Sequence, residues 1–282
     1  MAKKEKNTEP QYYMSAINNP VLNYNVYIMK PTERLLFFLL TFIAGGLVGL
    51  IFYGGLFKVE GEATFATFIS NIVVFAGVGF LSSKIFMKVI NNALRNKRLK
   101  KLKTQFRDFL DSLSNSLSGG MNVNDAIMNS YDDLESQYSP DAYIVKEVGE
   151  MINGIHNNIP IEEMLRDFGT RSGNDDIANF ATVFETAYRT GGNIKDIIRR
   201  TTDIISEKIM IAEEIQTKIT SNKLQMQIMN VIPIFLVLML RMSSSEFDAA
   251  FGSIVGVICM TIGVGFFLAA YKMGQKMMDI KG

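Results

Sequence analysis

The sequence predicts an all-α protein that crosses a membrane four times and carries a helical bundle in the cytoplasm. The first observation behind this prediction is that four long runs contain no charged residue, at positions 35–57, 63–83, 224–240 and 249–271. A helix needs about 20 apolar residues to cross the hydrocarbon core of a bilayer, and each run is close to that length. The second observation is that apolar residues of the segment 104–223 recur at spacings of three and four, as on one face of a helix.

Charge is unevenly distributed along the chain. The 29 basic and 28 acidic residues give a formal net charge of +1, so the total indicates no class of partner. Residues 84–103, however, contain eight Lys or Arg and no acid, whereas residues 104–223 contain 11 basic and 20 acidic residues, a balance of 11 − 20 = −9. Cys259 is the single cysteine, so no internal disulfide can form.

The basic residues also predict the orientation of the chain in the membrane. The connections 58–62 and 241–248 hold one basic residue each, whereas the N-terminal tail 1–34 holds five and the C-terminal tail 272–282 holds three. Because cytoplasmic loops carry an excess of Lys and Arg, we expect both tails and the segment 84–223 to face the cytoplasm.

The basic collar 84–103 precedes the bundle. Its part from Arg95 to Lys103 lacks the interleaved aromatic residues of a nucleic-acid site, so we expect no nucleic acid as partner. The better interpretation is contact with anionic lipid headgroups, and an acidic face of a partner protein is the second. The collar residues assigned to this contact are Arg95, Lys97, Arg98, Lys100, Lys101 and Lys103.

Two of the four runs are rich in glycine. Gly45 with Gly49, and Gly252 with Gly256, form small-xxx-small pairs, which let helix backbones approach closely and are interpreted as packing faces. Pro233 is expected to kink the third span. No Asp, Glu, Lys, Arg or His lies inside any run, which disfavours an ion-coupled transporter.

Turn and cap signals divide the segment 104–223 into helices. The first ends at Gly119-Gly120, and the second begins after Asn122. Ser139-Pro140-Asp141 is expected to begin a third, which ends at Gly154. Pro160 is expected to begin a fourth, which ends at Gly169.

The last two helices begin at asparagine caps. Asn174 begins a fifth helix that Gly191-Gly192 ends, and Asn193 caps the sixth. No Gly or Pro occurs between Ile194 and Lys223, so the sixth helix is predicted to run without a break toward the third span.

The order of several short motifs resembles a known family. The motifs are Phe109-Leu110-Asp111-Ser112-Leu113, Val123-Asn124-Asp125-Ala126-Ile127, Ile161-Glu162-Glu163-Met164-Leu165, and Phe184-Glu185-Thr186-Ala187 followed by Gly191-Gly192-Asn193-Ile194. Together with the attached spans they resemble the F domain of type II secretion and type IV pilus systems (GspF/PilC-like), over about residues 104–240. A single F domain with two spans on each side is more similar to the Tad pilus platform proteins TadB and TadC than to GspF, which carries two.

The resemblance implies a function. It implies a multi-pass platform protein in the bacterial inner or plasma membrane, on which a cytoplasmic assembly ATPase acts to move pilin or pseudopilin subunits into a fibre. A second platform subunit, identical or different, is a further expected partner. The residues at helix turns or in the matching motifs are the candidates for partner docking, namely Gly119, Gly120, Glu185, Gly191, Gly192 and Asn193.

No enzyme chemistry, cofactor or metal is expected. His156 is the only histidine, whereas a zinc site needs about four ligands, and no G-x-x-x-x-G-K-[ST] phosphate loop is present. The alternatives are a membrane sensor and a transporter subunit. A sensor would normally expose a sizeable outer region, and only the short connections 58–62 and 241–248 are available for one.

Overall fold

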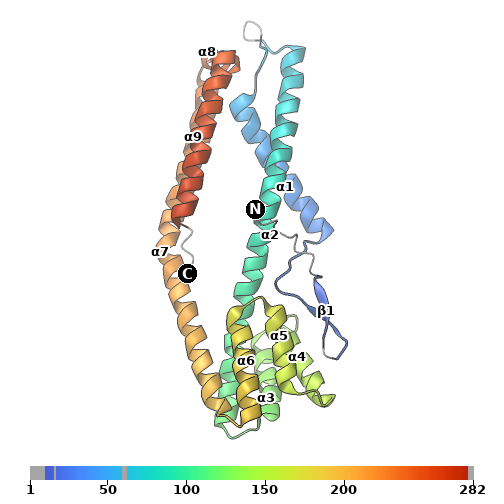
Figure 1. Ribbon diagram of the computed structural model, residues 1–282. Coiled ribbons are helices and arrows are strands. Elements are labelled where there is room, and N and C mark those ends of the chain that lie inside the picture. The colour runs from blue at the N-terminus through green and yellow to red at the C-terminus, as the bar shows by residue number, and fades with distance from the viewer. Residues whose placement is uncertain (1–9, 16, 59–61, 279–282) are drawn as a thin grey trace, which may run out of the picture. The chain divides into compact units, whose positions relative to one another are not determined.

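The structure is a computed structural model that describes residues 10–15, 17–58 and 62–278, and it is almost entirely helical (Figure 1). In these residues, two short strands precede the helices. The elements are β1 (Tyr12–Met14), β2 (Pro20–Leu22), α1 (Pro31–Tyr53), α2 (Phe65–Ser118), α3 (Val123–Gln137), α4 (Tyr143–His156), α5 (Ile161–Ser172), α6 (Asp175–Thr190), α7 (Ile194–Ser243), α8 (Ser245–Gly252) and α9 (Ile254–Met278).

The prediction of a helical chain with four apolar spans is confirmed in its coarse form. Four helices are long and apolar enough to cross a membrane, and the fourth of these segments is Ile254–Gly274. The antiparallel hairpin of β1 and β2 was not expected from the sequence. Four of the basic residues used to predict the orientation, Lys3, Lys4, Lys6 and Lys281, lie outside the described residues.

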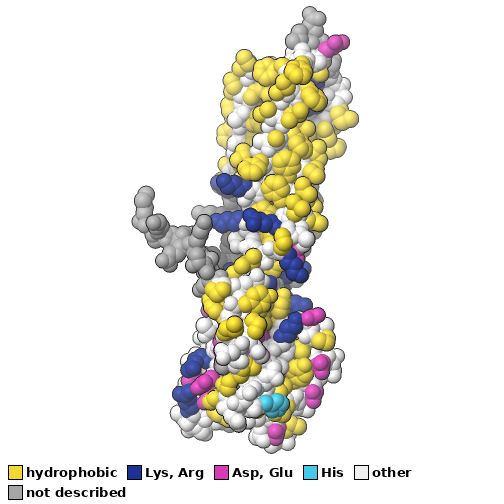
Figure 2. Space-filling model, turned by 90° about the vertical axis from the view of Figure 1, so that its right-hand side faces the viewer, with side chains coloured by type: hydrophobic (Ala, Val, Ile, Leu, Met, Phe, Trp, Pro, Cys, Tyr) yellow, Lys and Arg dark blue, Asp and Glu magenta, His cyan; other side chains and the backbone are white. Residues whose placement is uncertain are grey.

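The chain divides into two compact units. We call residues 1–28 and 91–211 the bundle unit, and residues 29–90 and 212–282 the apolar unit. On the face shown in Figure 2, hydrophobic side chains cover most of the apolar unit, whereas most of the acidic side chains are on the bundle unit.

Aromatic side chains fill the core of the bundle unit. Phe106 of α2 lies edge-on to Phe180 of α6 and to Phe168 of α5, with ring centroids 5.5 and 6.0 Å apart. Phe109, like these three rings, is almost completely buried. Burying a side chain of this size stabilises a fold by about 1.5–3 kcal/mol. The apolar face predicted for this part of α2 is therefore confirmed.

The asparagine caps are also confirmed. The side-chain oxygen of Asn122 accepts a hydrogen bond from the backbone of Asp125 at 2.9 Å, and that of Asn174 accepts one from Asp176 at 2.9 Å. Asn193 caps α7 in the same way. Each cap satisfies a backbone N–H that has no partner within its own helix.

Two predicted helix ends are wrong, because the glycines there serve packing. Gly169 lies inside α5, where an added Cβ would come within 3.1 Å of Ala178 of α6, and the helix continues to Ser172. Gly154 lies inside α4 against the side chain of Met164. Gly173 ends α5 instead, with a positive φ of 61° that a glycine adopts without strain.

The predicted start of the third bundle helix is also displaced. Ser139 accepts a backbone hydrogen bond from Ala142 at 2.9 Å, so these residues form a turn. α4 begins only after this turn, at Tyr143.

Two helices are longer than any single predicted segment. From Phe65 on, α2 includes the rest of the second apolar run, the basic collar and the first bundle helix without interruption, and α7 continues from Ile194 through the third run. Pro233 lies inside α7, and its kink stays a prediction.

The fourth run is divided between α8 and α9. The Ser253 hydroxyl accepts a hydrogen bond from the backbone of Gly256 at 3.1 Å, as a helix cap does. An absence of charge therefore marks apolar sequence but not the beginning of a helix.

Candidate functional site

Two exposed glycine turns lie at the same end of the bundle unit. Lys103 of α2 and Lys208 of α7 both form ion pairs with Asp176, so these two residues lie at the same level of the bundle. From Lys103, α2 continues forward to its end at Ser118, whereas α7 begins at Ile194, before Lys208 in the chain. Because the two helices run in opposite directions, the turn after α2 and the turn before α7 both lie at one end of the bundle (Figure 1). Five of the six predicted docking residues are in these turns.

The α2–α3 turn depends on the backbone of Gly120. Its φ is +91°, a conformation that other residues adopt only with strain, and nothing lies within 4 Å of an added Cβ. The N–H of Gly119 donates to the carbonyl of Asn115 at 3.0 Å, which extends the hydrogen bonding of α2.

The α6–α7 turn is built in the same way. Gly191 has a φ of +71°, and the N–H of Gly192 donates to the carbonyl of Ala187 at 2.7 Å. Asn193 then begins α7. The geometry therefore explains the glycines as turn formers, and their predicted role in docking a partner stays a prediction.

Glu185 does not lie with these turns. Its carboxylate forms ion pairs with Arg166 at 3.2 Å and Arg189 at 3.1 Å, on the adjoining surfaces of α5 and α6. Glu162 is buried beside them, 3.7 Å from Arg189, and its Oε2 has no hydrogen-bond partner among the described residues. The sixth docking candidate thus belongs to a separate charged cluster.

Three collar residues have partners inside the bundle unit. Arg95 donates to the carbonyl of Asn25 at 2.6 Å, and Arg98 donates to that of Val26 at 3.1 Å. Arg98 also stacks over the ring of Tyr27 at 4.4 Å, and Lys103 pairs with Asp176. These contacts fix the N-terminal segment to α2.

The other three collar lysines remain on the surface. Lys97 and Lys100 are exposed, and Lys101 has its ammonium 5.8 Å from the ring centroid of Tyr143. They keep the charge that contact with anionic headgroups requires, and the collar as a lipid contact stays a prediction.

A buried polar cluster that the sequence did not suggest joins the N-terminal segment to α4 and α5. The hydroxyl of Tyr24 donates to Glu147 at 2.8 Å, and Arg171 donates to both oxygens of that carboxylate at 3.0 and 2.9 Å. Arg171 also donates to the carbonyl of Leu22 at 3.0 Å. Tyr24, Glu147 and Arg171 are 2%, 4% and 4% exposed, so the cluster excludes water.

Burial and charge shift the pKa values of this cluster. Burial raises the pKa of Tyr24 well above its ordinary value, and the neighbouring Glu147 raises it further. Burial lowers the pKa of Arg171, but the carboxylates of Glu147 and Asp167 outweigh that effect and leave it raised. The phenol therefore stays protonated and the guanidinium stays charged.

A local signal for the hairpin was present in the sequence. The turn-forming Asn18-Asn19 lies between Tyr12-Tyr13-Met14 and Pro20-Val21-Leu22, as in a short β-hairpin. No local pattern, however, pairs Tyr24 with Glu147, which is 123 residues further along the chain.

In the apolar unit, the predicted packing glycines lie in two different places. Gly45 and Gly49 face α2, where an added Cβ would overlap the Ser82 hydroxyl or come within 2.8 Å of Val78. Gly252 and Gly256 lie at the corner between α8 and α9, each against a backbone carbonyl of the apolar unit. The structure therefore does not bring the two glycine pairs together.

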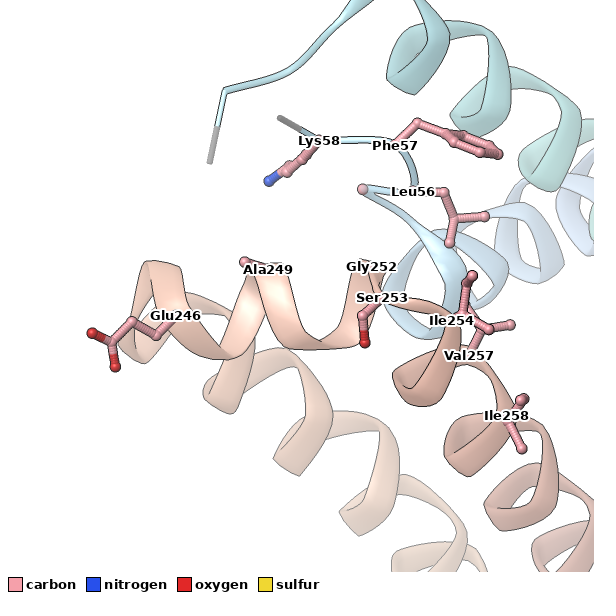
Figure 3. A pocket seen from close by; sticks show the side chains of 11 residues that line it. Leu56, Phe57, Lys58, Glu246, Ala249, Gly252, Ser253, Ile254, Val257 and Ile258 are labelled. Atoms are coloured by element: carbon pink, nitrogen blue, oxygen red, sulfur yellow. The ribbon is translucent and has the colours of Figure 1, made fainter. Parts of the chain in front are cut away.

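A pocket of about 920 Å³ lies beside the α8–α9 corner (Figure 3). Leu56, Ile254, Val257 and Ile258 gather on one side of it, while Lys58 lies at the other. Lys58 forms an ion pair with Asp248, which holds the segment after α1 against α8.

Comparison with known proteins supports the family that the motifs resemble. Residues 109–242 match the family model of type II secretion system (T2SS), protein F. This protein F match begins in α2, includes α3 to α6 and ends near the end of α7, slightly less than half of the chain. No curated protein and no solved structure matches the chain. Together with the four apolar helices, the protein F match supports a membrane protein of this family.

Proposed function

We propose that the chain is the platform protein of a bacterial type II secretion or type IV pilus machine of the Tad type. The observation that carries the proposal is the protein F match over residues 109–242, on a chain with four helices long enough to cross a membrane. One F domain with two candidate spans on each side favours the arrangement of TadB and TadC. The protein is placed in the inner or plasma membrane, with its tails and the bundle unit in the cytoplasm. It acts as a scaffold rather than as an enzyme.

The proposed role is to couple an assembly ATPase to the insertion of pilin or pseudopilin. Two observations support it. α2 and α7 each continue from the bundle unit into a candidate span, so force on the bundle unit acts on segments continuous with two spans. The turns at 119–122 and 191–193 are exposed at one end of the bundle unit and are the proposed contact for the ATPase.

A pull-down of the ATPase by the full chain in detergent tests this contact. Met121 lies in the first turn and Lys195 directly follows the second; both side chains are exposed, and the turn backbone does not require them. We expect Met121→Glu with Lys195→Glu to reduce recovery of the ATPase about tenfold, as the loss of about 1.4 kcal/mol at an interface does.

The matched control is Lys146→Glu. Lys146 is exposed on α4. The backbone of nearby Ile144 donates to Gln105 of α2 at 3.4 Å, which places this part of α4 away from the two turns. Equal recovery with the double variant and the control would contradict the proposed contact.

A further inference from the structure

A groove of about 580 Å³ lies in the apolar unit between the beginning of α1 and α2. Its walls are Leu35 and Phe38 of α1 with Phe80 and Met87 of α2. Leu35 is the first residue of the first charge-free run, and Ser83, which also lines the groove, is the last residue of the second. The groove is therefore at the boundary between apolar and charged sequence on both helices.

Two cations line the same groove. Arg34 and Lys84 are exposed, and among the described residues no carboxylate lies within 4.0 Å of either. Each directly adjoins a charge-free run, next to Leu35 and Ser83 respectively. The site thus combines apolar walls with two positive charges that have no acidic partner in the described part of the chain.

Hydroxyl groups fix the two walls to one another. The fully buried Ser83 donates to the carbonyl of Phe38 at 3.2 Å, and Ser82 donates to that of Thr41 at 3.0 Å. The rings of Phe38 and Phe80 meet edge to face, with centroids 6.5 Å apart. The two walls of the groove are therefore fixed to one another by contacts that do not involve its cations.

We propose that this groove binds one anionic phospholipid, phosphatidylglycerol serving as the probe. The phosphate lies between Arg34 and Lys84, and an acyl chain lies along Phe38 and Phe80. A basic pocket between membrane helices recognises an anionic headgroup by charge, and its apolar walls bury the chain. Lys84 is the first residue of the collar, whereas Arg95, Arg98 and Lys103 are already occupied within the bundle unit, so the site uses only this end of the collar.

Native mass spectrometry of the full chain, titrated with phosphatidylglycerol or phosphatidylcholine, tests the proposal. A basic residue near an anionic surface contributes about a fivefold gain in binding, so Arg34→Gln with Lys84→Gln is expected to weaken phosphatidylglycerol binding roughly 30-fold. The matched control is Arg199→Gln with Arg200→Gln, which removes two exposed charges of the bundle unit and is expected to leave phosphatidylglycerol binding within about twofold. Equal losses in the two double variants, or equal binding of the two lipids by the unaltered chain, would overturn the proposal.

Two further measurements separate charge from folding and lipid from free phosphate. The charge-conserving Arg34→Lys with Lys84→Arg is expected to retain binding within about threefold, and a loss as large as that of the glutamine variant would overturn the proposal. Glycerophosphoglycerol, the same headgroup without acyl chains, is expected to compete at least tenfold less well than the lipid. Equal competition would show a phosphate site without a lipid chain and would also overturn it.

Discussion

At the scale of single residues, the bundle unit contains a buried charge pair between α4 and α5 that also binds the N-terminal segment through Tyr24 and Leu22. Glu147 and Arg171 are both almost completely buried, and their hydrogen bonds satisfy both oxygens of the carboxylate. The desolvation of two charges offsets most of their attraction, so the pair itself stabilises the fold little. Removing one partner is different, because the other charge is then buried without compensation.

Arg171→Ala is therefore expected to destabilise the bundle unit by about 3–5 kcal/mol. Tyr24→Phe removes only one hydrogen bond to Glu147 and is expected to cost about 1.5–3 kcal/mol, the value for a bond to a charged group. Thermal unfolding of the full chain in detergent, followed by circular dichroism, measures both. Arg166→Ala is the control, because Arg166 is exposed and its surface pair is worth about 0–1 kcal/mol. A loss with Arg171→Ala no larger than with Arg166→Ala would contradict the expectation.

Tyr138 gives a prediction of pH dependence. Burial and then the hydrogen bond to Asp108 raise its pKa from 10.0 to about 12. Because the folded phenol keeps its proton to higher pH than the unfolded one, its stabilisation is complete below pH 10 and is lost as the pH rises to about 12.

Alkaline titration of the phenolate absorbance should show this step in the unaltered chain. Tyr138→Phe is expected to remove one tyrosine from the late part of the titration curve. If the variant instead loses a step near pH 10, the pKa of Tyr138 is not raised.

At the scale of elements, glycines at two kinds of position should respond differently to substitution. Gly191 has a positive φ and open space around an added Cβ, whereas Gly169 has an ordinary helical φ and close contact with α6. Gly191→Ala is expected to cost about 1–2 kcal/mol, and Gly191→Asn less, because asparagine tolerates the left-handed conformation.

At Gly169 we expect asparagine to destabilise the fold more than alanine does. Asparagine is larger than alanine, and the added atoms must displace Ala178 or Ala181. Thermal unfolding of the four variants checks the pattern. If asparagine is tolerated better than alanine at both positions, the contacts around Gly169 do not limit the size of the side chain at that position.

Local sequence signals predicted most helices but not the tertiary contacts that these helices make. Asn122, Asn174 and Asn193 marked helix starts correctly, because a cap acts within one turn of its own helix. The helix ends predicted at Gly154 and Gly169 are wrong, because a glycine that ends a helix and one that lets a neighbouring helix approach look alike in sequence. The hairpin was missed because its strands are only three residues each.

The candidate site was predicted in part for the same reason. The two glycine turns are predicted by glycine and asparagine residues that are adjacent in the sequence, and the structure places them at one end of the bundle unit. The separation of Glu185 from them, and the occupation of Arg95 and Arg98 by the N-terminal segment, depend on contacts between distant segments.

At the scale of the whole molecule, the proposed orientation predicts which residues face outward. In a Cys259→Ser background, a cysteine replacing Glu246, on α8, is expected to react with a membrane-impermeant maleimide in sealed, right-side-out cells. A cysteine replacing Lys146, an exposed residue of α4, is expected to react only after permeabilisation. Labelling of position 146 in sealed cells would place the bundle unit outside and contradict the platform function.

The long sequence separation within the Tyr24 cluster sets an order of events during synthesis. Tyr24 leaves the ribosome 123 residues before Glu147, a delay of roughly 6–25 s at translation rates of about 5–20 residues per second. Both α1 and the apolar part of α2 are made in that interval. The nascent N-terminal segment therefore waits without its partner until α4 and α5 emerge, and completion of the bundle unit is a late step that follows synthesis of the first two candidate spans.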